Sequence, residues 1–160
     1  MAATREDTGS RVTWAGHATV LFELDGVKLV TDPVLRNRVV HLRRHVPDHG
    51  RSITEGVDAV LISHLHFDHL DIPTLKRFDR DVRVIVPDGA GPLIRKAGFR
   101  DVVELREGEA TEVGAVTVLA VPADHDGRRH PFGLEVEALG YVIEGSSRMF
   151  FAGDTDLHPR

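Results

Sequence analysis

A short apolar run that ends in a cluster of titratable side chains limits what this chain can fold into. Residues 58–63 read DAVLIS, a continuous apolar segment with the length of one buried strand. The next residues read HLHFDHLD, so three histidines and two aspartates fall within residues 64–71. Because sites on layered α/β proteins usually lie where strands end in loops, the sequence predicts a sheet with a functional site at this edge.

Periodicity elsewhere in the chain predicts a strand-rich protein with two helices, an α/β layered arrangement. One helix is expected from Asp71, which has the position of a capping residue before Pro73, to Phe78. A second helix is expected over residues 89–98, where Gly98 ends it. Besides the apolar run, strands are expected at residues 11–16, 18–24, 27–32, 82–87, 101–105, 109–113, 116–123, 138–145 and 148–154.

Length and composition predict one domain over residues 11–160, preceded by a disordered N-terminus at residues 1–10. The absence of cysteine excludes disulfides and thiol nucleophiles, so metal chemistry must rest on histidine and carboxylate. The net charge of −5 argues against nucleic acid as a partner. The sequence shows no secretory signal and no transmembrane run of about 20 apolar residues, so we predict a cytoplasmic protein.

The spacing H-x-H-x-D-H brings metal-ligand side chains to one place. His64 and His66 are two residues apart, so they face the same side of an extended chain. Asp68 and His69 follow where the chain turns toward the helix capped by Asp71. Two imidazoles beside a carboxylate–imidazole pair suit two adjacent metal ions. Zinc prefers such ligands and leaves one position open for water, while Mn²⁺ or Fe²⁺ would accept the same donors.

The chain resembles the metallo-β-lactamase superfamily, whose signature is this order of residues after a strand. The segments GHATVLFELDGVKLVTDP, PADHDGRR and FFAGDT resemble further motifs of that superfamily. The residues of these segments are similar to those of the branch that contains N-acylphosphatidylethanolamine phospholipase D and the ascorbate-phosphate lactonases. The resemblance implies a four-layer αββα sandwich built from two similar halves.

The resemblance also implies roles for individual residues. Asp32 is implied to orient the histidine loop by hydrogen bonding, as carboxylates behind metal ligands commonly do. Asp68 is a candidate both to ligate a metal and to accept a hydrogen bond from the nucleophile. The implied ligands are His64, His66 and His125 for a first metal, Asp68 and His69 for a second metal, and Asp154 as a bridge between them.

The chain departs from the family pattern after Asp154. The family supplies one more histidine to the second metal, whereas only six residues follow Asp154 here, with His158 among them. We therefore expect a C-terminally incomplete copy that lacks much of the second half of the sandwich. The alternatives are that His158 substitutes as a ligand, that an oligomer or a partner chain completes the fold, or that the protein is a degraded copy.

Basic residues are expected around the metal ligands. The resemblance places His17 near the metals, where it would contact substrate or transfer a proton; the alternative is an ordinary turn histidine. Residues 36–51 contain five arginines and three histidines, and arginine forks match phosphate oxygens. Arg43, Arg44 and Arg128 are the expected contacts to an anionic substrate. An anionic membrane surface and a solvated loop are the alternative interpretations of this segment.

The first interpretation of function is a metal-dependent hydrolase that binds one or two Zn²⁺ ions. A metal-bound hydroxide, formed because zinc lowers the pKa of water to about 7, would attack a phosphodiester, a lactone or another ester. The substrate would be a small molecule or a phospholipid-like anion. A catalytically incomplete fragment, or a single-metal binding or interaction module of the same fold, is the alternative. An oxygen-using iron protein is the third interpretation.

Overall fold

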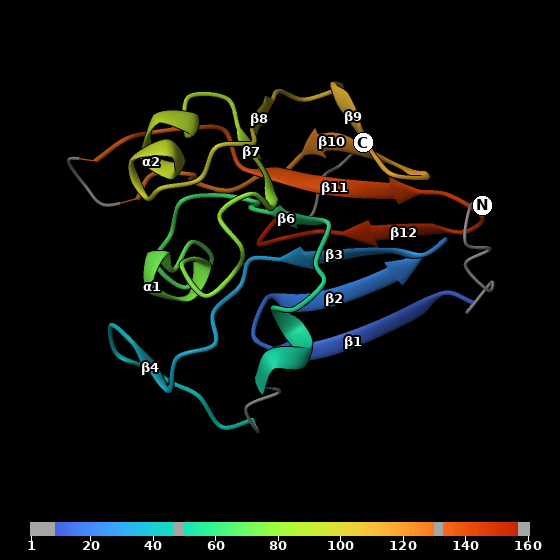
Figure 1. Ribbon diagram of the computed structural model, residues 1–160. Helices are drawn as coiled ribbons and strands as arrows, with labels where there is room; N and C mark the ends of the chain where they lie inside the picture. The colour runs from blue at the N-terminus through green and yellow to red at the C-terminus, as the bar shows by residue number, and fades with distance from the viewer. Residues whose placement is uncertain (1–8, 47–49, 130–132, 157–160) are drawn as a thin grey trace.

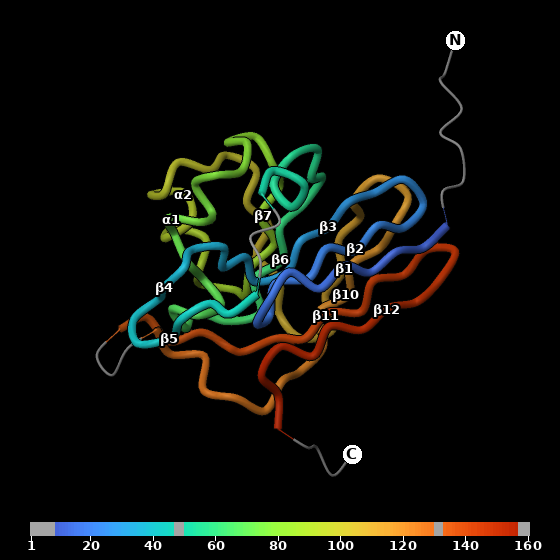
Figure 2. The backbone as a smooth tube through the Cα atoms, turned by 90° about the horizontal axis from the view of Figure 1, so that it is seen from below, coloured from blue at the N-terminus to red at the C-terminus, as the bar shows by residue number. Residues whose placement is uncertain are grey.

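Two sheets packed face to face form the centre of the molecule, and its helices cover the outer face of the larger sheet (Figure 1, Figure 2). The computed structural model describes residues 9–46, 50–129 and 133–156. The predicted α/β layering is confirmed as helices, sheet and sheet. The disorder predicted for residues 1–10 falls mainly on residues 1–8, which lie outside the described residues. No helix in the described ranges is long and apolar enough to cross a membrane.

The larger sheet combines an antiparallel half with a parallel half. The first three strands are antiparallel and the last three continue parallel to the third, so the carboxyl ends of these four strands meet at one edge. In sheet order the strands are β1 Arg11–Gly16, β2 Thr19–Leu24, β3 Val27–Thr31, β6 Ala59–Leu61, β7 Arg83–Pro87 and β8 Val102–Leu105.

The smaller sheet is antiparallel throughout and is tied to the larger sheet beside the histidine loop. The buried Tyr141 hydroxyl donates to the carbonyl of Ile62 at 2.7 Å, and the amide of Leu139 donates to the carbonyl of Ser63 at 2.9 Å. These bonds place the start of the histidine loop against the second sheet. In sheet order its strands are β12 Arg148–Phe151, β11 Leu139–Glu144, β10 Val116–Pro122 and β9 Ala110–Val113.

The strand β6 supplies both apolar cores, because successive side chains of a strand point to opposite faces. Val60 packs on the helix side with Leu75 and Ile94, whereas Leu61 packs between the sheets with Ile143. A strand buried on both faces reads as a continuous apolar run, which explains the sequence DAVLIS. The end of β6 is therefore held from both sides, and the histidine loop that follows starts from a fixed point.

The two helices are shorter than predicted. Helix α1 covers Ile72–Leu75, and its predicted cap is present: Asp71 Oδ2 accepts from the amide of Thr74 at 3.1 Å. The prediction that it continues to Phe78 is wrong, because the amide of Phe78 bonds to Leu75 three residues back and the chain tightens into turns. Helix α2 covers Gly91–Lys96, within the predicted range.

Residues 33–57 contain regular structure that the sequence did not predict. A hairpin is formed by β4 Arg38–Val39 and β5 Leu42–Arg43, and a 3₁₀ helix η1 covers Gly50–Ile53. Two-residue strands are too short to show a periodicity, which explains why no strand was predicted in this segment. The hairpin stands at the periphery of the molecule in both views (Figure 1, Figure 2).

Candidate metal centre

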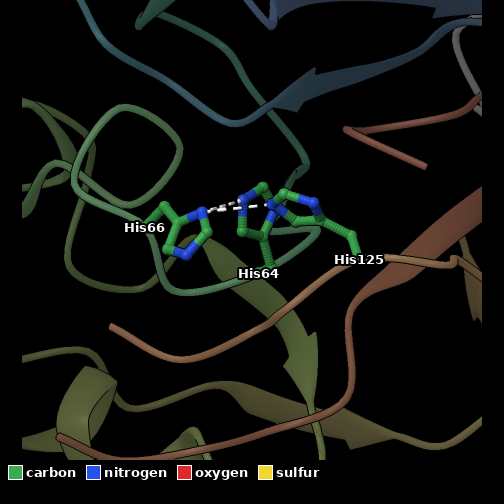
Figure 3. A group of neighbouring side chains, drawn as sticks. All are labelled: His64, His66 and His125. Atoms are coloured by element: carbon green, nitrogen blue, oxygen red, sulfur yellow. Dashed lines mark hydrogen bonds between the residues drawn. The ribbon is translucent and has the colours of Figure 1, made fainter. Parts of the chain in front are cut away.

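Three imidazoles converge where the loop after β6 meets the loop after β10 (Figure 3). His64 Nε2 lies 3.0 Å from His66 Nδ1, and His125 Nε2 lies 3.2 Å from the same His66 nitrogen. Two nitrogens bound to one tetrahedral zinc at its usual bond length are about 3.3 Å apart. The spacing of these three nitrogens therefore suits one metal ion.

A second group lies beside the first and contains Asp68, His69 and His17. Asp68 Oδ2 is 2.9 Å from His17 Nε2 and 3.7 Å from His69 Nε2. Asp154 Oδ2 is 3.1 Å from His69 Nε2 and 4.0 Å from His125 Nε2, so this carboxylate faces both groups. The structure thus brings together all six residues that the sequence proposed as ligands. His158 lies outside the described residues.

His69 carries the observation that best tests whether a metal fits. Its Nε2 is buried and has no hydrogen bond, the one such side-chain atom among the described residues. Asp154 Oδ2 lies 3.1 Å away but is not a hydrogen-bond partner of this nitrogen. An unsatisfied buried polar atom costs about 1–3 kcal/mol. A cation between His69, Asp68 and Asp154 would satisfy this nitrogen.

Asp32 supports both groups from behind. It is buried directly after β3, where Oδ1 accepts from the amide of Ser63 at 2.7 Å and Oδ2 accepts from His69 Nδ1 at 2.7 Å. The Ser63 hydroxyl also donates to Asp32 at 2.5 Å and lies 2.9 Å from His64 Nδ1. One carboxylate therefore orients one imidazole of each group. This geometry suits Asp32 to the positioning of these imidazoles, and its side chain is fully buried.

Burial lowers the pKa of both buried imidazoles, but their charged neighbours act on the two rings in opposite directions. Burial, together with the neighbouring imidazoles of His69 and His66, lowers the pKa of His64 to about 2. The His64 ring is therefore neutral, as a metal ligand must be. Burial alone would lower the pKa of His69, but the bond and charge of Asp32 raise it overall, assisted by Asp154 and Asp68. A cation that binds Nε2 must displace that proton.

Asp68 is held as a carboxylate by its neighbours. The hydrogen bond from His17 lowers the pKa of Asp68 well below its usual range, and the charge of His69 lowers it further. His17 itself sits in a left-handed backbone conformation at φ +51°, and its carbonyl accepts from Trp14 Nε1 at 2.8 Å. The exposed imidazole of His17 is thus aimed at Asp68 by the turn between β1 and β2.

The three arginines proposed to contact substrate have different surroundings. Arg44 donates to the carbonyls of Val34 at 3.0 Å and Val46 at 3.2 Å, and also to that of Ala15, so it holds the backbone together. Arg128 pairs with Glu135 at 2.7 Å. Arg43 is exposed and lines a cavity beside Asp68.

The structural role of Arg129 was not predicted from the sequence. Its Nη1 donates to the carbonyls of Leu65 at 2.8 Å and Leu70 at 3.1 Å, and its guanidinium stacks 4.3 Å from the ring centre of Phe67. Arg129 lies in the same loop as His125, and the carbonyls that it binds belong to the histidine loop. Its side chain therefore connects the two loops that carry the candidate ligands. The only sequence signal was a pair of adjacent arginines, which does not distinguish Arg129 from Arg128.

Replacing Arg129 with methionine is expected to lower the free energy of unfolding by about 2 kcal/mol, because hydrogen bonds from a charged group contribute about 1.5–3 kcal/mol. Urea denaturation in the presence of EDTA would measure this change. The metal affinity should also fall, since Leu65 and Leu70 flank the ligands. Arg128→Met is the matched control and should change stability by less than about 0.5 kcal/mol. Equal stability of the two variants would contradict the proposed link.

The sequence of this chain matches a known protein family over most of its length. Residues 28–160 match the family described as the beta-lactamase superfamily domain. With the paired sheets and the histidine loop at their edge, this match shows that the chain belongs to the metallo-β-lactamase superfamily.

Two curated relatives illustrate the range of this family. The N-acyl-phosphatidylethanolamine-hydrolyzing phospholipase D 1 of Caenorhabditis elegans is 33% identical over an alignment of 172 positions. The alignment covers 93% of this chain and 48% of the relative. The UPF0173 metal-dependent hydrolase of Koribacter versatilis is 31% identical over an alignment of 157 positions. The alignment covers 92% of this chain and 63% of the relative. The chain spans about half the length of the curated relatives it matches.

A solved structure with a similar fold carries a different activity. CmlA, a diiron beta-hydroxylase from Streptomyces venezuelae, superposes with a TM-score of 0.74 at 29% identity. The match covers 94% of this chain and 30% of CmlA. The fold therefore occurs in a diiron hydroxylase as well as in a protein named as a metal-dependent hydrolase.

Proposed function

We propose that this chain carries the binuclear zinc centre of a hydrolase that cleaves phosphodiesters, lactones or other esters. The observation that carries the proposal is the position of Asp154, whose Oδ2 is 3.1 Å from His69 Nε2 and 4.0 Å from His125 Nε2. One carboxylate thus faces two ligand groups, as a bridge between two ions requires. The names of the Caenorhabditis and Koribacter relatives support hydrolysis, and the former supports an anionic, phospholipid-like substrate.

The residues of this chain divide the work of such a reaction. Zinc at this site would polarise the scissile bond and lower the pKa of water to about 7. Asp32 and Ser63 fix the direction of the ligating imidazoles. Asp68, kept ionised by His17, accepts a hydrogen bond from the attacking water. The proton that this water loses would pass through Asp68 Oδ2 to His17 Nε2, which is 2.9 Å away and exposed, and would replace the proton that His17 gives to the leaving group.

A second candidate function is oxygen chemistry at two iron ions. It is favoured by the similarity to CmlA, at 29% identity and a TM-score of 0.74. Imidazole and carboxylate donors do not select zinc over iron, so the ligands alone leave both metals open.

A cytoplasmic location and completion of the fold by a second chain stay predictions.

Metal analysis combined with two substrates tests the proposal. The chain is purified without chelator, its zinc, manganese and iron are quantified, and it is then assayed on bis(4-nitrophenyl) phosphate and a simple lactone. The hydrolase predicts two zinc ions per chain and turnover of at least one substrate that EDTA abolishes. One ion without turnover would support a single-metal module, and two iron ions without hydrolysis would support oxygen chemistry.

A further inference from the structure

A cavity of about 250 Å³ lies between the end of β1 and the segment that carries the β4–β5 hairpin. Asp68 and His17 form part of its wall, so it adjoins the second ligand group. We propose that this cavity binds the apolar group of an anionic amphiphile, an alkyl or aryl phosphate ester whose ester group lies at the metal centre. The inference rests on the proposed function, since it names the substrate class of the same site.

The apolar character of the cavity comes from side chains that the core does not use. Trp14 is 58% exposed and Leu42 is 42% exposed, and both line the cavity. Val34, Val39 and Val46 complete the apolar wall. Ligand sites are typically concave and mainly apolar, with a few polar groups that set orientation. At about 30 Å³ for each water-sized group, the volume admits roughly eight such groups, enough for a short alkyl chain or a substituted ring.

The charges around the cavity favour a negative ligand. Its lining contains three arginines, Arg36, Arg43 and Arg44, but Asp68 is the one carboxylate among the described lining residues. Arg36 is paired with Asp71, and Arg44 donates to backbone carbonyls. Arg43 is exposed and is therefore the lining guanidinium placed to bind the anionic group of the ligand. Guanidinium forks match phosphate oxygens in geometry as well as in charge.

The wall of the cavity is preorganised by close backbone contacts. Arg44 binds carbonyls of β1 and of the hairpin segment, including Val34 at 3.0 Å. Gly16 has φ +111°, which residues with a side chain rarely adopt, and a Cβ there would also meet Val46 Cγ2 at 2.5 Å. Trp14 is held by its bond to the carbonyl of His17. A wall that is ordered before binding loses little entropy when a ligand enters.

Trp14 is the only tryptophan of the chain, so its fluorescence reports this cavity directly. The 160-residue chain is titrated with hexyl phosphate in EDTA, where neither metal binding nor hydrolysis contributes. A saturable fluorescence change is expected, with hexyl phosphate binding about tenfold tighter than hexanol or inorganic phosphate, because each of those lacks one half of the ligand. No saturable change would overturn the inference. The metal count and the hydrolysis assay are independent of this result, so the hydrolase could stand without it.

Two pairs of variants separate the cavity from the general charge of the hairpin. Arg43→Gln and Leu42→Gln should each weaken hexyl phosphate binding about fivefold or more, by removing a cavity cation or apolar contact. Arg38→Gln and Val40→Gln change exposed hairpin residues that do not line the cavity, and should leave affinity unchanged. Equal weakening by Arg38→Gln and Arg43→Gln would show nonspecific attraction and would overturn the assignment.

Discussion

Replacing His66 with alanine is expected to abolish metal-dependent hydrolysis while leaving the fold intact. His66 Nδ1 is the central atom of the first ligand group, 3.0 Å from His64 Nε2 and 3.2 Å from His125 Nε2. Loss of a partner behind a ligand already costs roughly 10–100-fold in metal affinity, so loss of the ligand itself should cost more than about 100-fold. Competition with a chromophoric chelator measures this affinity, and circular dichroism checks the fold.

The fold should survive because His66 is only half-buried and belongs to neither apolar core. His41→Ala is the matched control, since His41 is an exposed histidine at the turn of the β4–β5 hairpin. It should keep wild-type metal content and turnover. Full turnover by His66→Ala in metal-controlled buffer would remove this residue from the ligand set.

Replacing Asp32 with alanine is expected to cause the largest loss of stability, about 3–5 kcal/mol in the free energy of unfolding. Breaking a buried charged pair costs this much, because the partner is left without compensation. Here Asp32 and His69 are both fully buried and 2.7 Å apart. Urea denaturation in EDTA measures the effect without any contribution from metal.

Two further variants separate the charge of Asp32 from its shape. Asp32 has φ +35°, and asparagine tolerates this left-handed conformation better than most residues. Asp32→Asn should therefore lose less stability than Asp32→Ala, while metal affinity still falls because the bond to His69 loses its charge. Asp81→Ala removes an exposed carboxylate paired with Arg100 at 3.5 Å and should cost less than about 1 kcal/mol. Similar losses for Asp81→Ala and Asp32→Ala would contradict the proposed support.

The features that could be predicted from the sequence depend on residues that are close together in the chain. The strand before the histidine loop, the Asp71 cap and the family motifs are all visible within a few positions. The turn between β2 and β3 is similar: Asp25 and Gly26 both have positive φ, as the Asp-Gly pair predicts. Local spacing and local backbone preference are sufficient in each case.

The features that could not be predicted depend on contacts between distant segments. Arg129 reaches carbonyls 59 and 64 residues away, and Arg44 donates to the carbonyl of Ala15 across 29 residues. No periodicity marks such bonds, because carbonyls are present at every position. The cavity beside Asp68 likewise exists only because the hairpin segment folds against the end of β1.

The two contacts of Asp32 have a consequence for how the centre binds two metal ions. Its carboxylate holds His69 directly and His64 through the Ser63 hydroxyl, so any ordering of one imidazole is transmitted to the other. An ion that enters one position therefore stiffens the framework of its neighbour and lowers the entropy lost at the next step. Occupancy should rise cooperatively, with two-ion molecules forming at the expense of singly loaded ones.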